Sequence, residues 1–186
     1  MRTSVNYLPA LVAAVSGCRP AELKSGVSVH AERDVLRIVI SGAKLGEGKG
    51  QPERAIEYAL PCAHGLVADL ARAAEEAGGG IVVSIANPSS FCSAIRYYGH
   101  QVFPLRRKTI TPYCFRHAFA SDAKRNLANG DEVSAALGHQ SDRTRASYGQ
   151  AQIGRGGGLM PSHVEATHEV RHARTDPRNG PGRQLG

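Results

Sequence analysis

Apolar residues recur at helical spacing over much of the chain. In residues 6–15 they fall every three or four positions, and Gly17 follows where a helix would end. Residues 66–77 show the same pattern and run into a row of glycines. Prolines near the first turn mark the start of other helices. The predicted helices span residues 6–15, 19–23, 66–77, 88–102, 111–127, 131–137 and 142–148.

Three shorter segments have the composition or the alternation of strands. They span residues 27–29, 35–40 and 55–60, and a Gly-rich, charged loop at 41–53 separates the last two. A loop of this kind between neighbouring strands predicts a long hairpin with antiparallel pairing. The predicted fold is therefore mainly α-helical with a small three-stranded antiparallel sheet.

The pattern is lost beyond residue 150. Three consecutive glycines at 156–158 are followed by scattered prolines and histidines, with almost no periodic apolar residues. Such a segment buries too little apolar surface to fold by itself. We therefore expect a single folded domain at residues 1–150 and a disordered tail at 151–186.

Composition narrows the class of protein. A chain of 186 residues with 41% hydrophobic content is long enough to bury the core of one domain. No apolar run approaches the roughly 20 residues that a membrane span needs. The four cysteines are scattered, with no Cys-x-x-Cys pair, which favours reduced thiols over a zinc site. We expect a cytoplasmic protein with no metal.

The positive charge is concentrated in the second half of the folded part. The net charge is +7, yet residues 1–95 carry nine basic and nine acidic side chains. Residues 96–145 carry nine basic and four acidic ones. A basic surface of this kind either attracts a polyanion, nucleic acid first among them, or is simply solvated.

Four sequence segments carry candidate chemistry. Residues 16–23 read Ser-Gly-Cys-Arg-Pro-Ala-Glu-Leu, and the charged loop at 41–53 holds Lys44 and Lys49. Residues 111–120 read Thr-Pro-Tyr-Cys-Phe-Arg-His-Ala-Phe-Ala, and Leu-Gly-His at 137–139 precedes Tyr148 by nine residues. Arg116, in the segment 111–120, lies on a largely apolar predicted helix. Its charge therefore needs a partner or a ligand.

Together these segments resemble the catalytic domain of the tyrosine recombinases, the phage-integrase and Xer-type family. The first is similar to the family's Thr-Gly-x-Arg-x-x-Glu-Leu box, and residues 111–120 are similar to its His-x-Leu-Arg-His-x-Phe-Ala box. The loop at 41–53 resembles the family's lysine-bearing hairpin. The Leu-Gly-His triplet and Tyr148 match the last box both in residue type and in the spacing between them. The resemblance covers about residues 8–150.

The resemblance implies covalent cleavage of a DNA phosphodiester without a metal or another cofactor. Arg19 and Arg116 would clamp the phosphate through their guanidinium groups, and Tyr148 would attack in line. Lys44, with Lys49 as the alternative, would protonate the leaving 5′ oxygen. His139 would bond the phosphate or assist proton transfer. The implied function is site-specific recombination, such as integration or excision of a mobile element, by a homo-oligomer (a synaptic tetramer) on double-stranded DNA.

Each of these residues also has a plain structural interpretation. Arg19 and Glu22 are spaced like an ion pair on a helix surface. His139 suits the carboxyl end of a helix, Tyr148 suits a core, and Lys44 alone is a solvated lysine. The joint pattern in chain order, rather than any one residue, favours the functional interpretation.

Two departures from the family pattern modify the expectation. Tyr113 stands where the family has a histidine, three residues before the second arginine, and a phenol donates a hydrogen bond but is not a cation at neutral pH. We expect reduced or retuned activity from Tyr113. We also expect no core-binding domain ahead of residue 1. Two alternatives therefore stay open: a non-catalytic DNA-binding remnant of an integrase, and a type IB topoisomerase-like enzyme that relaxes DNA.

Overall fold

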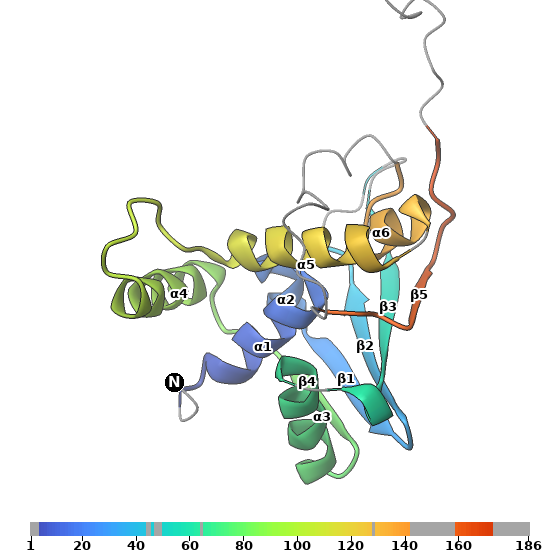
Figure 1. Cartoon of the computed structure of the whole chain (residues 1–186), viewed down its shortest axis with the longest axis horizontal. Coiled ribbons are helices and arrows are strands. Elements are labelled where there is room, and N and C mark those ends of the chain that lie inside the picture. Colours follow the sequence, from blue (N-terminus) through green and yellow to red (C-terminus); the bar gives the residue numbers. More distant parts are fainter. Residues whose placement is uncertain are drawn as a thin grey trace, which may run out of the picture.

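The computed structural model describes residues 4–43, 46, 50–63, 65–127, 129–141 and 159–172 (Figure 1). Its helices appear where the apolar spacing predicts them, within one or two residues at their ends. They are α1 (Tyr7–Ser16), α2 (Pro20–Ser25), α3 (Leu66–Glu76), α4 (Pro88–Val102), α5 (Pro112–Asn126) and α6 (Gly130–Ala136), with a short 3₁₀ helix at Leu60–Cys62. The helix predicted at 142–148 lies outside the described residues.

The sheet has five strands rather than the three predicted. They are β1 (Val27–Glu32), β2 (Val35–Ser41), β3 (Glu53–Ala59), β4 (Gly80–Val83) and β5 (His163–Ala166). The order across the sheet is β4-β1-β2-β3-β5, and every neighbouring pair is antiparallel. The three predicted strands therefore form the centre, and two short strands extend it on both edges.

Both missed strands are short and sit where the sequence indicated something else. β4 follows the glycines that end α3, and its four residues pair with the outer edge of β1. β5 also has only four residues, which is too few for a periodic pattern to stand out. It pairs with β3 through backbone hydrogen bonds, which do not require a particular pattern of side chains. The prediction of a disordered tail is wrong over residues 159–172.

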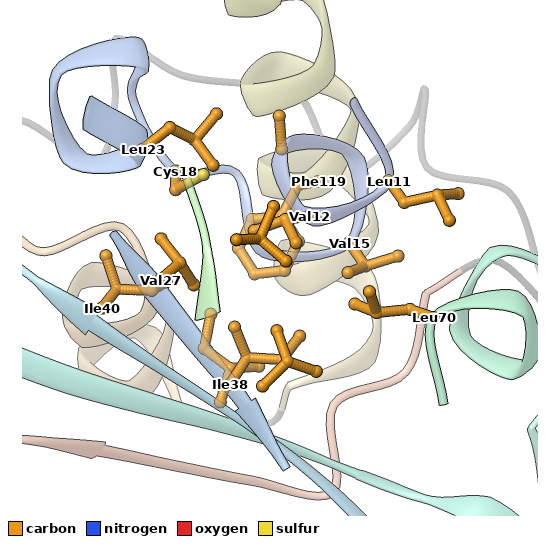
Figure 2. Close-up of a cluster of buried hydrophobic side chains, with 14 of the residues drawn as sticks. Leu11, Val12, Val15, Cys18, Leu23, Val27, Ile38, Ile40, Leu70 and Phe119 are labelled. Carbon is orange, nitrogen blue, oxygen red and sulfur yellow. The ribbon is translucent and has the colours of Figure 1, made fainter. Parts of the chain in front are cut away.

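The core lies between the sheet and the helices that cover one of its faces. β2 alternates buried Leu36, Ile38 and Ile40 with less buried residues, as expected for a strand with one face inward. α1 packs against both α3 and α5, and Val12 and Val15 of α1 are fully buried. In Figure 2 the side chains of α1 and α5 meet those of the strands in a single cluster. Among the described residues, no helix is both long and apolar enough to cross a membrane.

Candidate active site

Arg19 lies at the amino end of α2, directly after the turn that follows α1. Gly17 forms this turn with a φ of 61°, and a Cβ there would come within 2.7 Å of Phe119 on α5. The turn and α5 can therefore pack closely only because residue 17 has no side chain. The Glu22 carboxylate accepts hydrogen bonds from the Arg19 backbone N–H at 2.7 Å and from its Nη1 at 2.8 Å. Arg19 is held in place, with 14% of its side chain still exposed.

Glu22 also binds Arg54 of β3, and both side chains are completely buried. Arg54 Nη2 donates to Oε2 of Glu22 at 2.9 Å and Nη1 donates to Oε1 at 3.2 Å, which is a two-pronged pair. Burial by itself would raise the pKa of Glu22, but Arg54 and Arg19 outweigh it and lower the pKa to about 2. Arg54 Nε donates to the Ala136 carbonyl at 2.9 Å. This arginine therefore links α2 to the end of α6.

Arg116 makes a second link between the same parts of the chain. It lies in the second turn of α5 with only 1% of its surface exposed. Its Nη1 donates to the Gly17 carbonyl at 2.7 Å, and its Nη2 donates to the Leu137 carbonyl. Nη2 also lies 3.2 Å from Nε2 of His139. The turn before Arg19 and the turn before His139 are thus joined through one guanidinium group.

His139 is buried and electrically neutral at physiological pH. Its pKa is lowered to about 3, first by burial and then by the positive charges of Arg116, Arg19 and Arg54. A guanidinium group can only donate, so Nε2 must accept from Arg116, and the ring proton belongs on Nδ1. The His139 backbone N–H donates to the Ser134 carbonyl at 2.8 Å, which fixes the residue after the end of α6.

The loop between β2 and β3 is fastened beside His139. The Gln51 backbone N–H donates to the Gly138 carbonyl at 3.2 Å, and the Gln51 side chain donates to the His139 carbonyl at 3.3 Å. The Gln140 side chain donates to the Gly50 carbonyl at 2.6 Å. The carboxyl-terminal arm of the loop that carries both candidate lysines is therefore bonded to residues 138–140.

The cluster carries an excess of positive charge. Among the described residues, Arg19, Arg54 and Arg116 contribute three positive charges and Glu22 offsets one, which leaves two with His139 neutral. Charge of this kind in a largely buried setting favours an anion, and guanidinium groups match the paired oxygens of a phosphate. In the described part of the chain, no group of three or more His, Cys, Asp or Glu side chains could hold a metal ion.

Solved structures provide a comparison for the fold. The crystal structure of the XerA recombinase matches with a TM-score of 0.50 and 22% sequence identity, over 77% of this chain and 52% of that chain. The fold of this chain is therefore similar to that of the matched part of the XerA recombinase. This chain spans about half the length of the XerA recombinase.

Two structures of the XerH site-specific recombinase also match, one a pre-cleavage complex with difH substrate and one a post-cleavage complex with palindromic difH substrate. Their TM-scores are 0.46 and 0.47 at 19% and 18% identity, over 76% and 75% of this chain and 41% and 40% of those chains. No family model matches the sequence, and neither does any curated protein.

The structure brings three of the predicted site residues together, namely Arg19, Arg116 and His139. Tyr113 lies in the first turn of α5 and is 45% exposed, and the described residues show no hydrogen bond from it to those three. Lys44, Lys49 and Tyr148 lie outside the described residues.

Two members of the cluster escaped the sequence analysis. Glu22 was interpreted as the partner of Arg19 on a helix surface, whereas its side chain is fully buried. Arg54 lies between the predicted loop at 41–53 and the predicted strand at 55–60, and it was given no role. Its position did contain a signal, because Arg54, Ile56 and Tyr58 alternate along β3 and so share the inward face. A charge on that face requires a buried partner.

The ion pair of Arg54 predicts a large stability effect. Arg54→Met leaves Glu22 buried without its main partner, so we expect a loss of about 3–5 kcal/mol in the free energy of unfolding. Urea denaturation followed by circular dichroism measures it. Arg37→Met on β2 is the matched control, because the Arg37 side chain is 39% exposed and its removal should change stability little. Equal midpoints for the two variants would contradict the structural role of Arg54.

The lowered pKa of His139 predicts a loss of stability in mild acid. Below pH 6.5 the unfolded chain protonates this histidine, whereas the folded protein does not until about pH 3. Protonation therefore favours unfolding, by at most about 1.4 kcal/mol per pH unit. Glu22 has a pKa of about 2 in the folded protein against an ordinary value of 4.5, so its stabilisation is lost only below about pH 4.5.

Urea unfolding of the parent and of His139→Gln between pH 7.5 and pH 5 isolates the histidine. The slope of the free energy of unfolding against pH should be smaller in the variant by up to about 1.4 kcal/mol per pH unit, which corresponds to one proton. If the two slopes are the same over this range, His139 titrates normally in the folded protein.

Proposed function

We propose that this protein cleaves and rejoins DNA strands through a 3′-phosphotyrosine intermediate, in the manner of a site-specific recombinase. The observation that carries the proposal is the meeting of Arg19, Arg116 and His139 in one cluster with excess positive charge. These residues come from three distant segments of the chain, and each belongs to a segment that resembles a recombinase box. The similarity to the XerA fold supports the same conclusion.

The two arginines would stabilise the transition state. A phosphodiester under attack gains negative charge on its non-bridging oxygens, and fixed guanidinium groups compensate for that charge without reorganising. Arg19 is the partly exposed member and can face the substrate, while Arg116 lies deeper. The neutral imidazole of His139 accepts from Arg116 through Nε2, so it would help to hold this guanidinium group in place beside the phosphate.

Tyr148 would be the nucleophile. Its phenol would lose a proton to solvent as the phenolic oxygen forms a bond to phosphorus, while the bond from phosphorus to the 5′ oxygen breaks. The leaving oxygen would take a proton from Lys44, or from Lys49 in the alternative assignment. A 5′ hydroxyl from another strand would then attack the phosphotyrosine and release Tyr148. The energy of the cut bond stays in the phosphotyrosine, so rejoining needs no other energy source.

The fastened loop supports a lysine in this role. Gly50 and Gln51 are hydrogen-bonded to residues 138–140. The last part of the loop between β2 and β3 therefore lies beside His139. Tyr113 would take the place of the family's histidine as a hydrogen-bond donor to the phosphate. It is exposed in the first turn of α5, two positions into the helix that also carries Arg116.

The proposal extends to the substrate and the assembly. Double-stranded DNA would be the partner, residues 1–150 would form the catalytic unit, and several copies would act together on the DNA. Integration or excision of a mobile element is the setting that we infer. Relaxation of supercoiled DNA by the same chemistry is the rival enzyme activity, and DNA binding without turnover is the rival that Tyr113 favours.

Covalent trapping tests the proposal. A nicked suicide DNA substrate loses the 5′ end needed for rejoining, so an active protein should accumulate as a DNA adduct that resists SDS in the presence of EDTA. Tyr148→Phe should abolish the adduct, because it removes the attacking oxygen. Tyr98→Phe should retain it, since the Tyr98 hydroxyl bonds to Ser4 at 3.2 Å in another part of the fold.

An adduct that survives Tyr148→Phe contradicts the assignment of the nucleophile. A parent protein that binds DNA but gives no adduct on any nicked substrate is a DNA-binding remnant. Relaxation of supercoiled plasmid without a defined target sequence favours the topoisomerase-like activity.

A further inference from the structure

A small basic pocket lies beside the candidate active site but is not part of it. It has a volume of about 70 Å³ and lies between the carboxyl-terminal half of α4 and the loop that leads to α5. Arg96 and His100 line it from the helix, and Arg106, Lys108 and Thr109 line it from the loop. We call these five residues the α4 notch. In Figure 1 this loop projects at the end of the molecule where α5 begins.

The notch is a folded feature of the chain. Gly99 lies on α4, and a Cβ there would come within 2.8 Å of Ile110, so the returning loop packs on the bare helix backbone. The Phe103 N–H donates to the Gly99 carbonyl at 2.9 Å, and the Arg106 N–H donates to the Phe103 carbonyl at 3.1 Å. These contacts turn the loop back along α4 and bring its basic residues next to those of the helix.

The stretch of sequence that forms the notch contains no acidic residue. Residues 77–121 include no Asp or Glu, although they include five Lys or Arg. Arg96, Arg106, Arg107 and Lys108 are all exposed. In the described part of the chain, no carboxylate forms an ion pair with any of these four. Like charges held together in this way without counter-charges favour a bound anion.

We propose that the α4 notch binds a phosphate of the DNA backbone other than the one that is cut. This inference rests on the proposed function and names a second contact for the same substrate. A volume of about 70 Å³ has room for an oxyanion such as a phosphate group. The basic side chains supply charge and donors, and Thr109 supplies a hydroxyl.

The position of the notch fits a phosphate close to the reacting one. Ile110 leads directly into Thr111, the residue that precedes α5, and Arg116 follows in the second turn. At about 1.5 Å of rise per helical residue, Arg116 lies on the order of 7–8 Å along the axis from Thr111. The notch and Arg116 are therefore separated by only the first turns of α5, and one duplex would contact both in the proposed arrangement.

The salt dependence of DNA binding tests this contact. Each phosphate that a protein neutralises contributes about −0.9 to the slope of log K against log salt concentration. The triple variant Arg96→Gln/Arg106→Gln/Lys108→Gln should therefore make the slope less steep by about 0.9, and each of the three single variants should show part of that change. Fluorescence anisotropy with a labelled duplex measures the slope, in a Tyr148→Phe background so that no covalent adduct accumulates.

Arg33→Gln is the matched control, because it changes the net charge equally. Arg33 lies in the turn between β1 and β2, away from α4, and its removal should leave the slope unchanged. Arg33→Gln in the Tyr148 parent should also still form the covalent adduct, because neither the notch nor the cluster around Arg116 is changed.

Three results would overturn the proposal. The first is a salt slope in every notch variant that equals the slope of the parent, while the parent still cuts DNA. This result would contradict the notch contact and leave the proposed function intact. The second is a loss of affinity that does not depend on salt, which would indicate an apolar contact through the 96% exposed Leu105. The third is stabilisation of the parent by inorganic pyrophosphate that Arg106→Gln removes without altering the DNA slope, which would indicate a site for a free anion. Absence of salt-dependent DNA binding by the parent would instead defeat the proposed function itself.

Discussion

The buried ion pair between Glu22 and Arg54 is the constraint on which the candidate site depends. Neither charge could remain in the interior without the other, because each would lose its hydration with nothing in return. Their pairing fixes α2 against β3, and through the Ala136 carbonyl it also fixes the end of α6. Arg19 then uses the same carboxylate, so the orientation of a partly exposed arginine is set by a fully buried pair.

Arg116 completes a closed set of links. It ties the Gly17 carbonyl to the Leu137 carbonyl, so the turns that precede Arg19 and His139 cannot move apart independently. Burial first, and then the charge of Arg116 with those of its neighbours, lowers the pKa of His139 and keeps it neutral. The same guanidinium group thus positions two segments and tunes the residue beside it. A site assembled in this way is preorganised for an anion, which is the condition for electrostatic stabilisation of a transition state.

Local pattern predicted much of this arrangement and missed the part that depends on tertiary context. Helices such as α4 and α5 were recoverable because proline, caps and apolar spacing all agree. The strand β5 was not, because a short edge strand is held by backbone pairing with β3 and needs little of its own sequence. The approach of Arg19, Arg116 and His139 followed from family resemblance rather than spacing. The alternation of inward and outward positions along β3 indicates that Arg54 faces inward. Its partner Glu22 could not be predicted, because its spacing from Arg19 is also that of an ion pair on a helix surface.

The central claim is that Arg19 and its neighbours stabilise charge on a phosphate rather than only the fold. The most direct test compares covalent adduct formation by the parent and by Arg19→Ala on two nicked substrates. One has the natural phosphate at the cut site, and the other has a methylphosphonate, in which a neutral methyl group replaces a charged oxygen. We expect the variant to be slower on the phosphate by roughly two orders of magnitude or more, and most of this deficit to disappear on the methylphosphonate. An equal deficit on both substrates would contradict the claim, because the arginine would then act only on the structure.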